Sequence, residues 1–501
     1  MSGFKKLSRR GLLVGGAALA SASVIRPTFA EDEGSAASAP LGPPPDRWES
    51  LRRVTKGALL RPGDADYSQA ALPNNLRFRH IRPEAIAPCS SAQMVADVLS
   101  WCRDYDMPFV VRGGGHSYSG FSTSHGLVID MSPMRAIQYD PRSGLVRVEA
   151  GATNRELFAA QRQVGRIVTH GRCPTVGIAG FLLGGGVGFN MRRFGVCSDL
   201  MTEAEIVTAD GALRRLSAEQ DADLFWAVRG GGGGNFGVST SFTLRTQPVD
   251  EQLTAFRMVW RDKTLEVAKA LFHAAEMAPN GFASRISLGG VTPAQSGKGR
   301  QVSVTMIGQF IGDRDGLMAI LKPVLDAGPP DFSDIREGGY WEAQEFLMEP
   351  GAPAWFRERS TFLPASPDDA FLEAAFDRLR HWPGTGAHGD LFFFQTGGRI
   401  NEIAPDETAF VHRSSHWLAV VGANWSEDDN ARPDITRRAV AWQDDFYAMV
   451  GEYGGQGAFQ NFADASLVDW RTRYFGANLD RLMAIKAAVD PTNLFRHPQS
   501  L

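Results

Sequence analysis

The sequence predicts an α+β protein with two main domains. Its 501 residues are more than one hydrophobic core usually fills, and 43% of them are apolar, which is enough for well-packed cores. Short strand-like and helix-like runs alternate up to residue 248. Beyond that point the β runs are longer and helices fill the spaces between them, as in an antiparallel sheet covered by helices.

The elements of the first domain, residues 48–248, are short and are separated by glycine-rich turns. A polar helix is expected over 91–104, and an apolar strand over 108–112 leads into a glycine turn at 113–115. The remaining expected elements are strands over 126–130, 145–150 and 204–209 and helices over 153–164 and 223–229.

The second domain, residues 249–455, has longer runs with the composition of strands and amphipathic helices. The expected strands cover 302–310, 391–395 and 416–425, and the expected helices cover 264–276 and 368–380. A final segment, residues 456–501, contains a helix that starts at Trp470.

Residues 1–30 have the pattern of an export signal. A basic start with Ser8-Arg9-Arg10-Gly11 precedes apolar and small residues, and Thr28-Phe29-Ala30 suits a signal peptidase. The arginine pair is similar to a twin-arginine signal, which predicts a periplasmic or secreted protein. The alternative is a chance arginine pair before an ordinary secretory signal or an anchor. Residues 31–47, rich in Ala, Ser, Pro and Gly, are expected to be a disordered linker.

The charge balance excludes some classes of function. The formal net charge is −4, and removing residues 1–30, which hold five basic and no acidic residues, takes it to −9. An acidic protein is a poor candidate for binding nucleic acid or an anionic membrane. We expect no membrane span in the mature chain and a small-molecule substrate as the main partner.

The four cysteines do not suggest a disulfide framework. Cys89 and Cys102 flank the expected helix 91–104, and 13 residues of helix would separate them by about 20 Å, beyond the ~7 Å that a disulfide spans. Together with Cys197 they are expected to be small buried hydrophobes.

Two nucleophilic side chains lie among glycines: His116 in 112–117 and Cys173 in 171–177. The glycine-rich segments 113–115, 184–188 and 230–234 could turn backbone N–H groups toward a pyrophosphate, because no side chain stands in the way. None of them fits a nicotinamide-dinucleotide fingerprint or a P-loop. The histidines and cysteines also lack metal-ligand spacing. These features predict a site for a flat, phosphate-bearing ligand.

These motifs resemble those of the berberine bridge enzyme-like FAD-linked oxidases, in the vanillyl-alcohol oxidase class. The resemblance implies one FAD bonded twice, at its 8α carbon to His116 and at C6 to Cys173. It also implies a two-part PCMH-type FAD-binding domain over 48–248, a substrate domain over 249–455 with its antiparallel sheet, and a segment 456–501 that returns to the FAD-binding domain.

The resemblance extends to further stretches, among them the turn ending at Asp199, the strand at 206–211 and the closing motifs 474–482 and 490–495. The residues that it implies for FAD binding are Arg112, Gly113, Gly114, Gly115, His116, Ser117, Cys173, Val176, Gly177, Ile178, Gly180, Gly184, Gly185, Gly186, Gly188, Asp199, Ile206, Val207 and Asn478.

Two departures from the family pattern bear on catalysis. Phe181 stands where many relatives have a histidine, and Phe459 stands where carbohydrate-oxidising relatives have the tyrosine that deprotonates the substrate. Phenylalanine cannot take a proton, so another residue must be the base. The candidates are Tyr118, Tyr474, Asp390, Glu402 and His412. Gln395 is expected to orient the substrate, because an amide cannot act as a base.

A third departure concerns the electron acceptor. The family resemblance puts Ile178 and Ala179 near the flavin edge where O2 reacts, and Ala179 replaces a common glycine. The bulk of Ile178 predicts slow reaction with O2 and electron transfer to another acceptor, such as a quinone or a carrier protein.

The sequence therefore predicts an FAD-dependent oxidoreductase that removes hydride from an alcohol, sugar or secondary metabolite. Two alternatives stay open. One is a carbohydrate oxidase acting at the anomeric carbon, and the other is a protein that binds flavin without turnover.

Overall fold

The computed structural model describes residues 45–249, 252–290, 301–455 and 457–501. The predicted signal over 1–30 and most of the predicted linker over 31–47 lie outside these residues. The first described element is α1 (Pro45–Val54). The predicted α+β class is confirmed, because helices and largely antiparallel sheets occur together in the described chain.

A small parallel sheet opens the structure, with strand order β1-β3-β2. Its strands are β1 (Ala85–Pro88), β3 (Leu127–Asp130) and β2 (Phe109–Arg112). Helix α3 (Ala92–Asp104) makes the crossover from β1 to β2, as parallel strands require. It begins where the Ser91 side chain accepts a hydrogen bond from the Met94 N–H, close to the predicted start. Cys89, Cys102 and Cys197 are free thiols in the core, and burial raises the pKa of each.

A five-stranded antiparallel sheet follows, in the order β4-β5-β9-β7-β8. Helix α4 (Asn154–Val164) lies between β5 and β7 in the chain; Thr153 and Glu156 cap its start, and Gly165 ends it with a φ of 61°. The strands are β4 (Ile137–Asp140), β5 (Leu145–Glu149), β9 (Val238–Arg245), β7 (Met201–Val207) and β8 (Leu213–Ser217). Short elements near the glycine segments are β6 (Arg166–Ile167), α5 (Ile178–Leu183), α6 (Met191–Phe194) and α7 (Ala222–Ala227).

Strand β10 (Gln247–Pro248) pairs with β6 at the point where the sequence analysis divides the chain. Beyond it, seven strands form one antiparallel sheet in the order β14-β11-β13-β12-β16-β17-β15. They are β14 (Phe332–Gly338), β11 (Leu253–Trp260), β13 (Val302–Ile311), β12 (Phe282–Gly290), β16 (Gly389–Gln395), β17 (Trp417–Trp425) and β15 (Trp355–Leu363).

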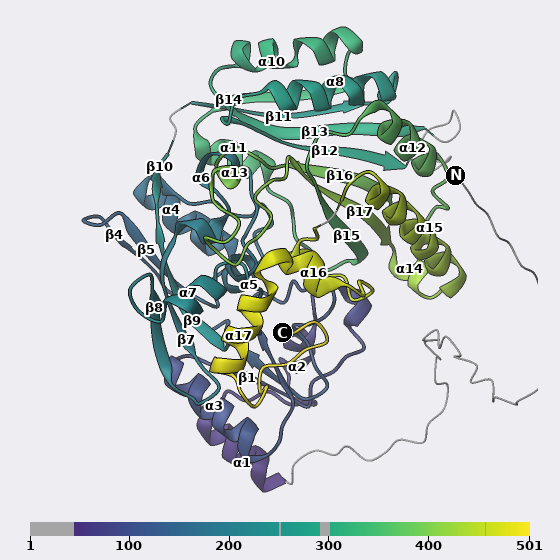
Figure 1. Cartoon of the computed structure of the whole chain (residues 1–501). Helices are drawn as coiled ribbons and strands as arrows, with labels where there is room; N and C mark the ends of the chain where they lie inside the picture. Colours follow the sequence, from purple (N-terminus) through teal and green to yellow (C-terminus); the bar gives the residue numbers. More distant parts are fainter. Residues whose placement is uncertain (1–44, 250–251, 291–300, 456) are drawn as a thin grey trace, which may run out of the picture. The chain divides into compact units, whose positions relative to one another are not determined.

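The two faces of the seven-stranded sheet have different neighbours. Helices α8 (Thr264–Met277), α10 (Arg314–Ala327), α12 (Asp369–Arg380) and α15 (Pro433–Glu452) cover one face (Figure 1). Because side chains alternate along a strand, Leu391 and Phe393 of β16 pack with these helices. Phe392 and Phe394 point the other way, toward Val187 and Phe410. That second face forms one side of the candidate site.

The segment after residue 456 packs into the core of the first half of the chain. Lys486, on α17 (Leu479–Val489), is buried, and its ammonium group donates to Asp490 Oδ2 at 2.7 Å, Asn235 O at 2.8 Å and Phe495 O at 2.6 Å. This contact holds the final loop against the glycine segment that ends at Asn235. None of the helices in the described ranges is long and apolar enough to cross a membrane.

Candidate functional site

A cavity of about 360 Å³ brings together the glycine segments, the final segment and the seven-stranded sheet. Its volume lies in the range of small-molecule and cofactor sites, about 300–1,000 Å³. The lining comes from segments within 109–122, 171–189, 232–239, 459–475 and 495–499, and from Met131, Asn154, Glu349 and Phe394.

The loop that carries His116 leaves the end of β2. Arg112, the last residue of β2, donates to Ser122 O at 2.8 Å and to Ala70 O at 2.5 Å. These bonds brace the loop at both ends, and Gly115 turns the chain with a φ of 73°. His116 and Ser117 then line the cavity.

The loop that carries Cys173 is held by the start of α4. Asn154 donates through Nδ2 to Cys173 O at 3.0 Å and through its backbone N–H to Val176 O at 3.0 Å. The Arg155 N–H donates to Pro174 O, also at 3.0 Å. The first N–H groups of a helix have no partner within the helix, so the Cys173 loop supplies their acceptors.

Thr175 links the two nucleophiles. Its Oγ1 lies 2.9 Å from His116 Nε2, 3.5 Å from Cys173 Sγ and 3.1 Å from Gly351 O. The single hydroxyl proton donates to the Gly351 carbonyl, so Oγ1 accepts from the His116 Nε2–H. Burial lowers the pKa of His116 to about 4, so the ring is neutral at pH 7. Its Nδ1 therefore keeps a free lone pair, as a nucleophile requires.

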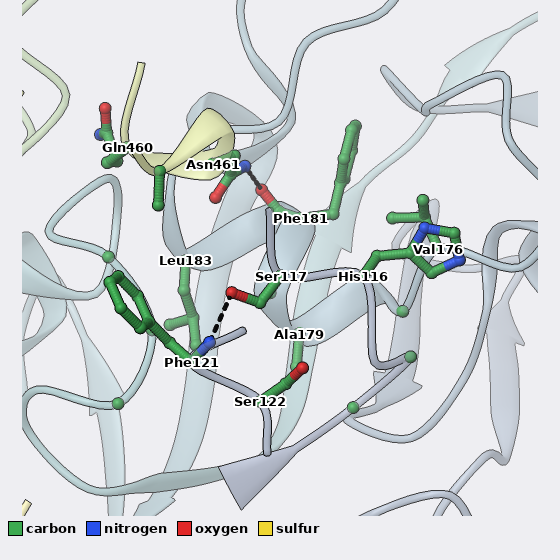
Figure 2. Close-up of a pocket in the computed structure, with 18 of the residues that line it drawn as sticks. His116, Ser117, Phe121, Ser122, Val176, Ala179, Phe181, Leu183, Gln460 and Asn461 are labelled. Carbon is green, nitrogen blue, oxygen red and sulfur yellow. Dashed lines mark hydrogen bonds between the residues drawn. The ribbon is translucent and has the colours of Figure 1, made fainter. Parts of the chain in front are cut away.

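The two loops touch through glycine backbone. A Cβ on Gly114 would lie 2.2 Å from Gly177 N, and a Cβ on Gly177 would lie 2.2 Å from Gly114 N. No side chain fits at either position, so these glycines serve the approach of the two loops to each other. Figure 2 shows His116 beside Val176 on one side of the cavity, with Gln460 and Asn461 of η3 (Gln460–Phe462) on the other.

The lining fits a polar, flat cofactor of the FAD type. Four residues that line this cavity have a buried polar atom with no hydrogen-bond partner in the described chain, namely Ser122 Oγ, Asn154 Oδ1, Gln460 Oε1 and His497 Nε2. Unpaired buried polar atoms cost free energy, which a ligand rich in donors and acceptors would recover. The turn at Gly232–Gly234, with positive φ at its two ends, exposes backbone in the same wall. Among the described residues, no group of three His, Cys, Asp or Glu side chains is placed to hold a metal.

Ten of the predicted FAD-binding residues line the cavity. They are Gly113, Gly114, Gly115, His116, Ser117, Cys173, Val176, Gly177, Gly180 and Gly188. The other nine do not line the cavity and instead have structural roles elsewhere in the described chain. Arg112 braces the His116 loop, Asn478 donates to Pro405 O and Thr408 O, and Ile206 and Val207 lie in the core of the first half.

The triple glycine 184–186 is the clearest correction. A Cβ there would lie 2.0 Å from Asn461 Oδ1 at Gly184, 2.8 Å from the Phe410 ring at Gly185 and 2.7 Å from the Phe181 ring at Gly186. These glycines make room for protein side chains instead of phosphates. Asp199 is likewise internal, since it forms a buried bidentate ion pair with Arg413 at 2.7 and 2.8 Å.

Ile178 does not stand at the cavity wall. Its side chain is fully buried in the core, whereas Val176 and Ala179 line the cavity. The predicted block to O2 by Ile178 is therefore wrong, because helix α5 turns that side chain away. Val176 and Ala179, the residues beside Ile178 that do line the cavity, have small side chains.

The predicted role of Gln395 is also wrong. Gln395 follows Phe393 on the helix-covered face of β16, where its Nε2 donates to Ala275 O at 2.6 Å and its Oε1 accepts from Ser284 at 3.1 Å. It cannot reach the cavity on the opposite face. The strand was predicted correctly, but the period-two alternation decides which of its side chains reach the site.

Of the candidate bases, Tyr118 has the most suitable position. It lines the cavity, stacked on Phe462 at 4.7 Å between ring centroids and edge-on to Phe356 at 5.1 Å. Tyr474 also lines the cavity, but its hydroxyl accepts from Asp464 N and donates to Gln499. Glu402 is exposed and paired with Arg399, and His412 is buried against Phe362.

Sequence reasoning missed several residues of this wall. Glu349 lines the cavity and pairs with Arg172 at 2.5 Å and Arg285 at 3.3 Å. Thr175 does not line the cavity but contacts both nucleophiles, and it could have been noticed from its place two residues after Cys173. His497 and Gln460 gave no signal, because only the fold brings the final segment to the cavity. Phe181 and Phe459, the two departures, both line it and make its wall aromatic.

Comparison with known proteins agrees with this geometry. Residues 83–217 match the family described as FAD binding domain, and residues 458–501 match the one described as berberine and berberine like. The chain is 31% identical over 453 residues to the FAD-linked oxidoreductase YgaK of Bacillus subtilis, covering 89% of this chain and 96% of that protein. It is 28% identical to a carbohydrate oxidase of Microdochium nivale, covering 88% and 92%.

A solved structure shows the same fold. Berberine bridge enzyme-like 1 from Physcomitrella patens superposes with a TM-score of 0.80 at 27% identity, and the match covers 90% of this chain and 98% of that one.

Proposed function

Because the chain belongs to the berberine bridge enzyme-like family of FAD-linked oxidases, we propose that its FAD is bonded covalently to both His116 and Cys173. The chain is an FAD-linked oxidoreductase. We further propose that it oxidises an alcohol, sugar or secondary metabolite by removal of hydride.

The observation that carries this proposal is the convergence of both nucleophiles on Thr175. His116 Nε2 and Cys173 Sγ lie 2.9 and 3.5 Å from one hydroxyl oxygen, although 57 residues separate them in the chain. A single flavin ring could meet both. Two bonds would fix that ring and prevent its loss.

The chain's own residues would supply position and a base. Bound FAD supplies the hydride acceptor, flavin N5. Phe394, Phe459, Phe462 and Tyr118 form an aromatic wall that would hold a flat substrate face. Tyr118 would take the proton of the substrate hydroxyl while its carbon gives up hydride, so that the product is a carbonyl compound and one proton remains on the protein.

Denaturing gels test the attachment directly. Wild type should keep flavin fluorescence after unfolding, and His116→Ala and Cys173→Ala should each keep one bond with altered absorption spectra. The double variant should lose all covalent flavin. Peptide masses must place the flavin on both residues, and a spectrum unchanged by Cys173→Ala would refute the second bond.

Anaerobic bleaching of the flavin tests the reaction. A panel of sugars, aromatic alcohols and alkaloids separates the substrate classes, and a relative named a carbohydrate oxidase makes sugars the leading alternative. Bleaching by sugars alone would favour oxidation at the anomeric carbon. No bleaching by any compound would favour a protein that binds flavin without turnover.

O2 is proposed as the electron acceptor, because the small side chains of Val176 and Ala179 would leave room for O2 in the cavity. Admitting air to the bleached protein should restore the flavin within seconds, whereas persistent bleaching would point to a quinone or a carrier protein.

Export through the twin-arginine route is proposed from residues 1–30 alone. Replacing Arg9 and Arg10 with lysine should keep the protein in the cytoplasm, and unchanged export would indicate an ordinary secretory signal.

A further inference from the structure

Behind Tyr118, two carboxyl groups lie on the cavity-facing side of the seven-stranded sheet. Phe356 and Glu358 point to the same face of β15, since they are two residues apart. Tyr118 lies edge-on to the Phe356 ring, and burial together with the nearby Glu358 carboxyl group raises the pKa of the Tyr118 hydroxyl. Asn75 fixes this arrangement by donating to Tyr118 O at 2.9 Å and Phe356 O at 3.0 Å.

The second carboxyl group is Asp390, in the same row of the sheet. Gly422 of β17 pairs with Glu358 on one side and with Asp390 on the other. A Cβ on Gly422 would lie 2.3 Å from Asp390 Oδ1, so the missing side chain leaves the space that the Asp390 carboxyl group occupies between the strands.

Both carboxyl groups have an oxygen with no partner. Asp390 is 7% exposed, and its Oδ1, like Oε2 of Glu358, is buried without a hydrogen bond in the described chain. Unpaired buried carboxylate oxygens are costly unless a proton or a ligand reaches them. Burial raises the pKa of Glu358 to about 8, with Asp390 contributing, and burial also raises that of Asp390. The other groups facing Glu358 are Tyr118, Arg285 and Glu349.

We infer that Glu358, assisted by Asp390, is the terminal acceptor of the proton that Tyr118 takes from the substrate hydroxyl. The inference rests on the proposed oxidation, and it names a proton acceptor that can replace the tyrosine base found in relatives at the position of Phe459. The O–H bond of the substrate breaks, Tyr118 gains that proton and passes its own to Glu358, and the hydride goes to the flavin. The electron pair thus leaves with hydride, and one proton stays in the carboxyl pair until solvent removes it. Tyr118 is the catalytic residue; Glu358 and Asp390 act through it.

The sign of the pH dependence follows from the groups named. Glu358 can accept a proton only when it is ionised, so the rate of anaerobic flavin reduction should rise about tenfold per pH unit below a midpoint near 8 and level off above it. Glu358→Gln should lower the limiting rate roughly 100-fold or more and remove this pH dependence. Glu358→Asp should keep part of the limiting rate and part of the pH dependence, because it retains a carboxyl group.

Asp390→Asn is the decisive variant. Removing that neighbouring negative charge should move the midpoint to lower pH and leave most of the limiting rate. Asp334→Asn, at the far edge of the same sheet, is the matched control and should change neither. An unmoved midpoint in Asp390→Asn, together with a Glu358→Gln rate near that of wild type, would overturn the inference.

A measurement without substrate separates this inference from the proposed oxidation. Infrared difference spectra of the flavin-loaded protein should show a protonated carboxyl band that disappears as the pH rises through about 8 and is missing in Glu358→Gln. If that band is present but no substrate bleaches the flavin, the proposed oxidation is wrong, while Glu358 is still shown to gain and lose a proton. If bleaching occurs in wild type without the band, the inference fails alone.

Discussion

A single methyl group at Gly114 should disrupt attachment of the flavin. The added Cβ would lie 2.2 Å from Gly177 N and 2.8 Å from Thr175 O. Ordinary contacts of a Cβ start near 3.4 Å, so the two loops must separate by at least about 1 Å. His116 is two residues from this contact, and Cys173 is four residues from Gly177. A displacement of about 1 Å at reacting groups costs roughly 100-fold in rate, so covalent attachment in Gly114→Ala should slow by that factor.

The assay is in-gel flavin fluorescence of denatured protein after timed incubation of the apoprotein with FAD. Gly177→Ala should behave like Gly114→Ala, because the same atoms collide from the other side. Gly451→Ala is the matched control, since its Cβ would meet nothing within 4 Å in α15. Attachment in Gly114→Ala at the wild-type rate would refute the steric reasoning. A general folding defect would show as loss of thermal stability, which Gly451→Ala should leave unchanged or slightly improved.

Three further perturbations follow from the same contacts. Thr175→Val removes the acceptor for the His116 Nε2–H, so attachment at His116, measured by peptide mass, should slow about tenfold, whereas Thr175→Ser should keep it; equal rates would contradict the tautomer argument. Lys486→Met leaves buried Asp490 without its cation and should lower the free energy of unfolding by about 3–5 kcal/mol in a denaturant titration; a loss under 1 kcal/mol would show that the contact is dispensable. Ala179→Leu puts a larger side chain into the cavity and should slow reoxidation of the bleached flavin by air at least tenfold in stopped flow. An unchanged rate would show that O2 reaches the flavin by another path.

Local features of the chain were predictable where one side chain or one period decides them. The helix after Ser91, the strand that ends at Arg112 and the motif residues His116 and Cys173 follow from caps, hydrophobic runs and glycine spacing. The meeting of the two nucleophile motifs was suggested only by family resemblance, because spacing along the chain carries no information on a contact through Thr175.

The errors have a common physical cause. A glycine in a sequence indicates that another group packs closely against the backbone, but it does not indicate whether that group is a cofactor or a side chain of the protein. At Gly184 the neighbour is Asn461, from a segment 277 residues away. The predicted roles of Gln395 and Ile178 were wrong for a related reason, since the face on which a side chain lies depends on the register and packing of its whole element. Glu358 was missed because a charged residue in a strand is usually solvated, and only Gly422 and Asp390 show that this one is not.

The contact between Lys486, Asn235 and Phe495 sets the order of events during biosynthesis. Phe459, Gln460, Tyr474 and His497 complete a cavity most of whose other lining residues lie before residue 240. A nascent chain therefore has no closed cofactor site until residues 459–499 have been made, and binding of flavin in that site must follow their synthesis. Tags or truncations that pull the last residues away from Asn235 would consequently yield colourless protein even if every residue of the two nucleophile loops is intact.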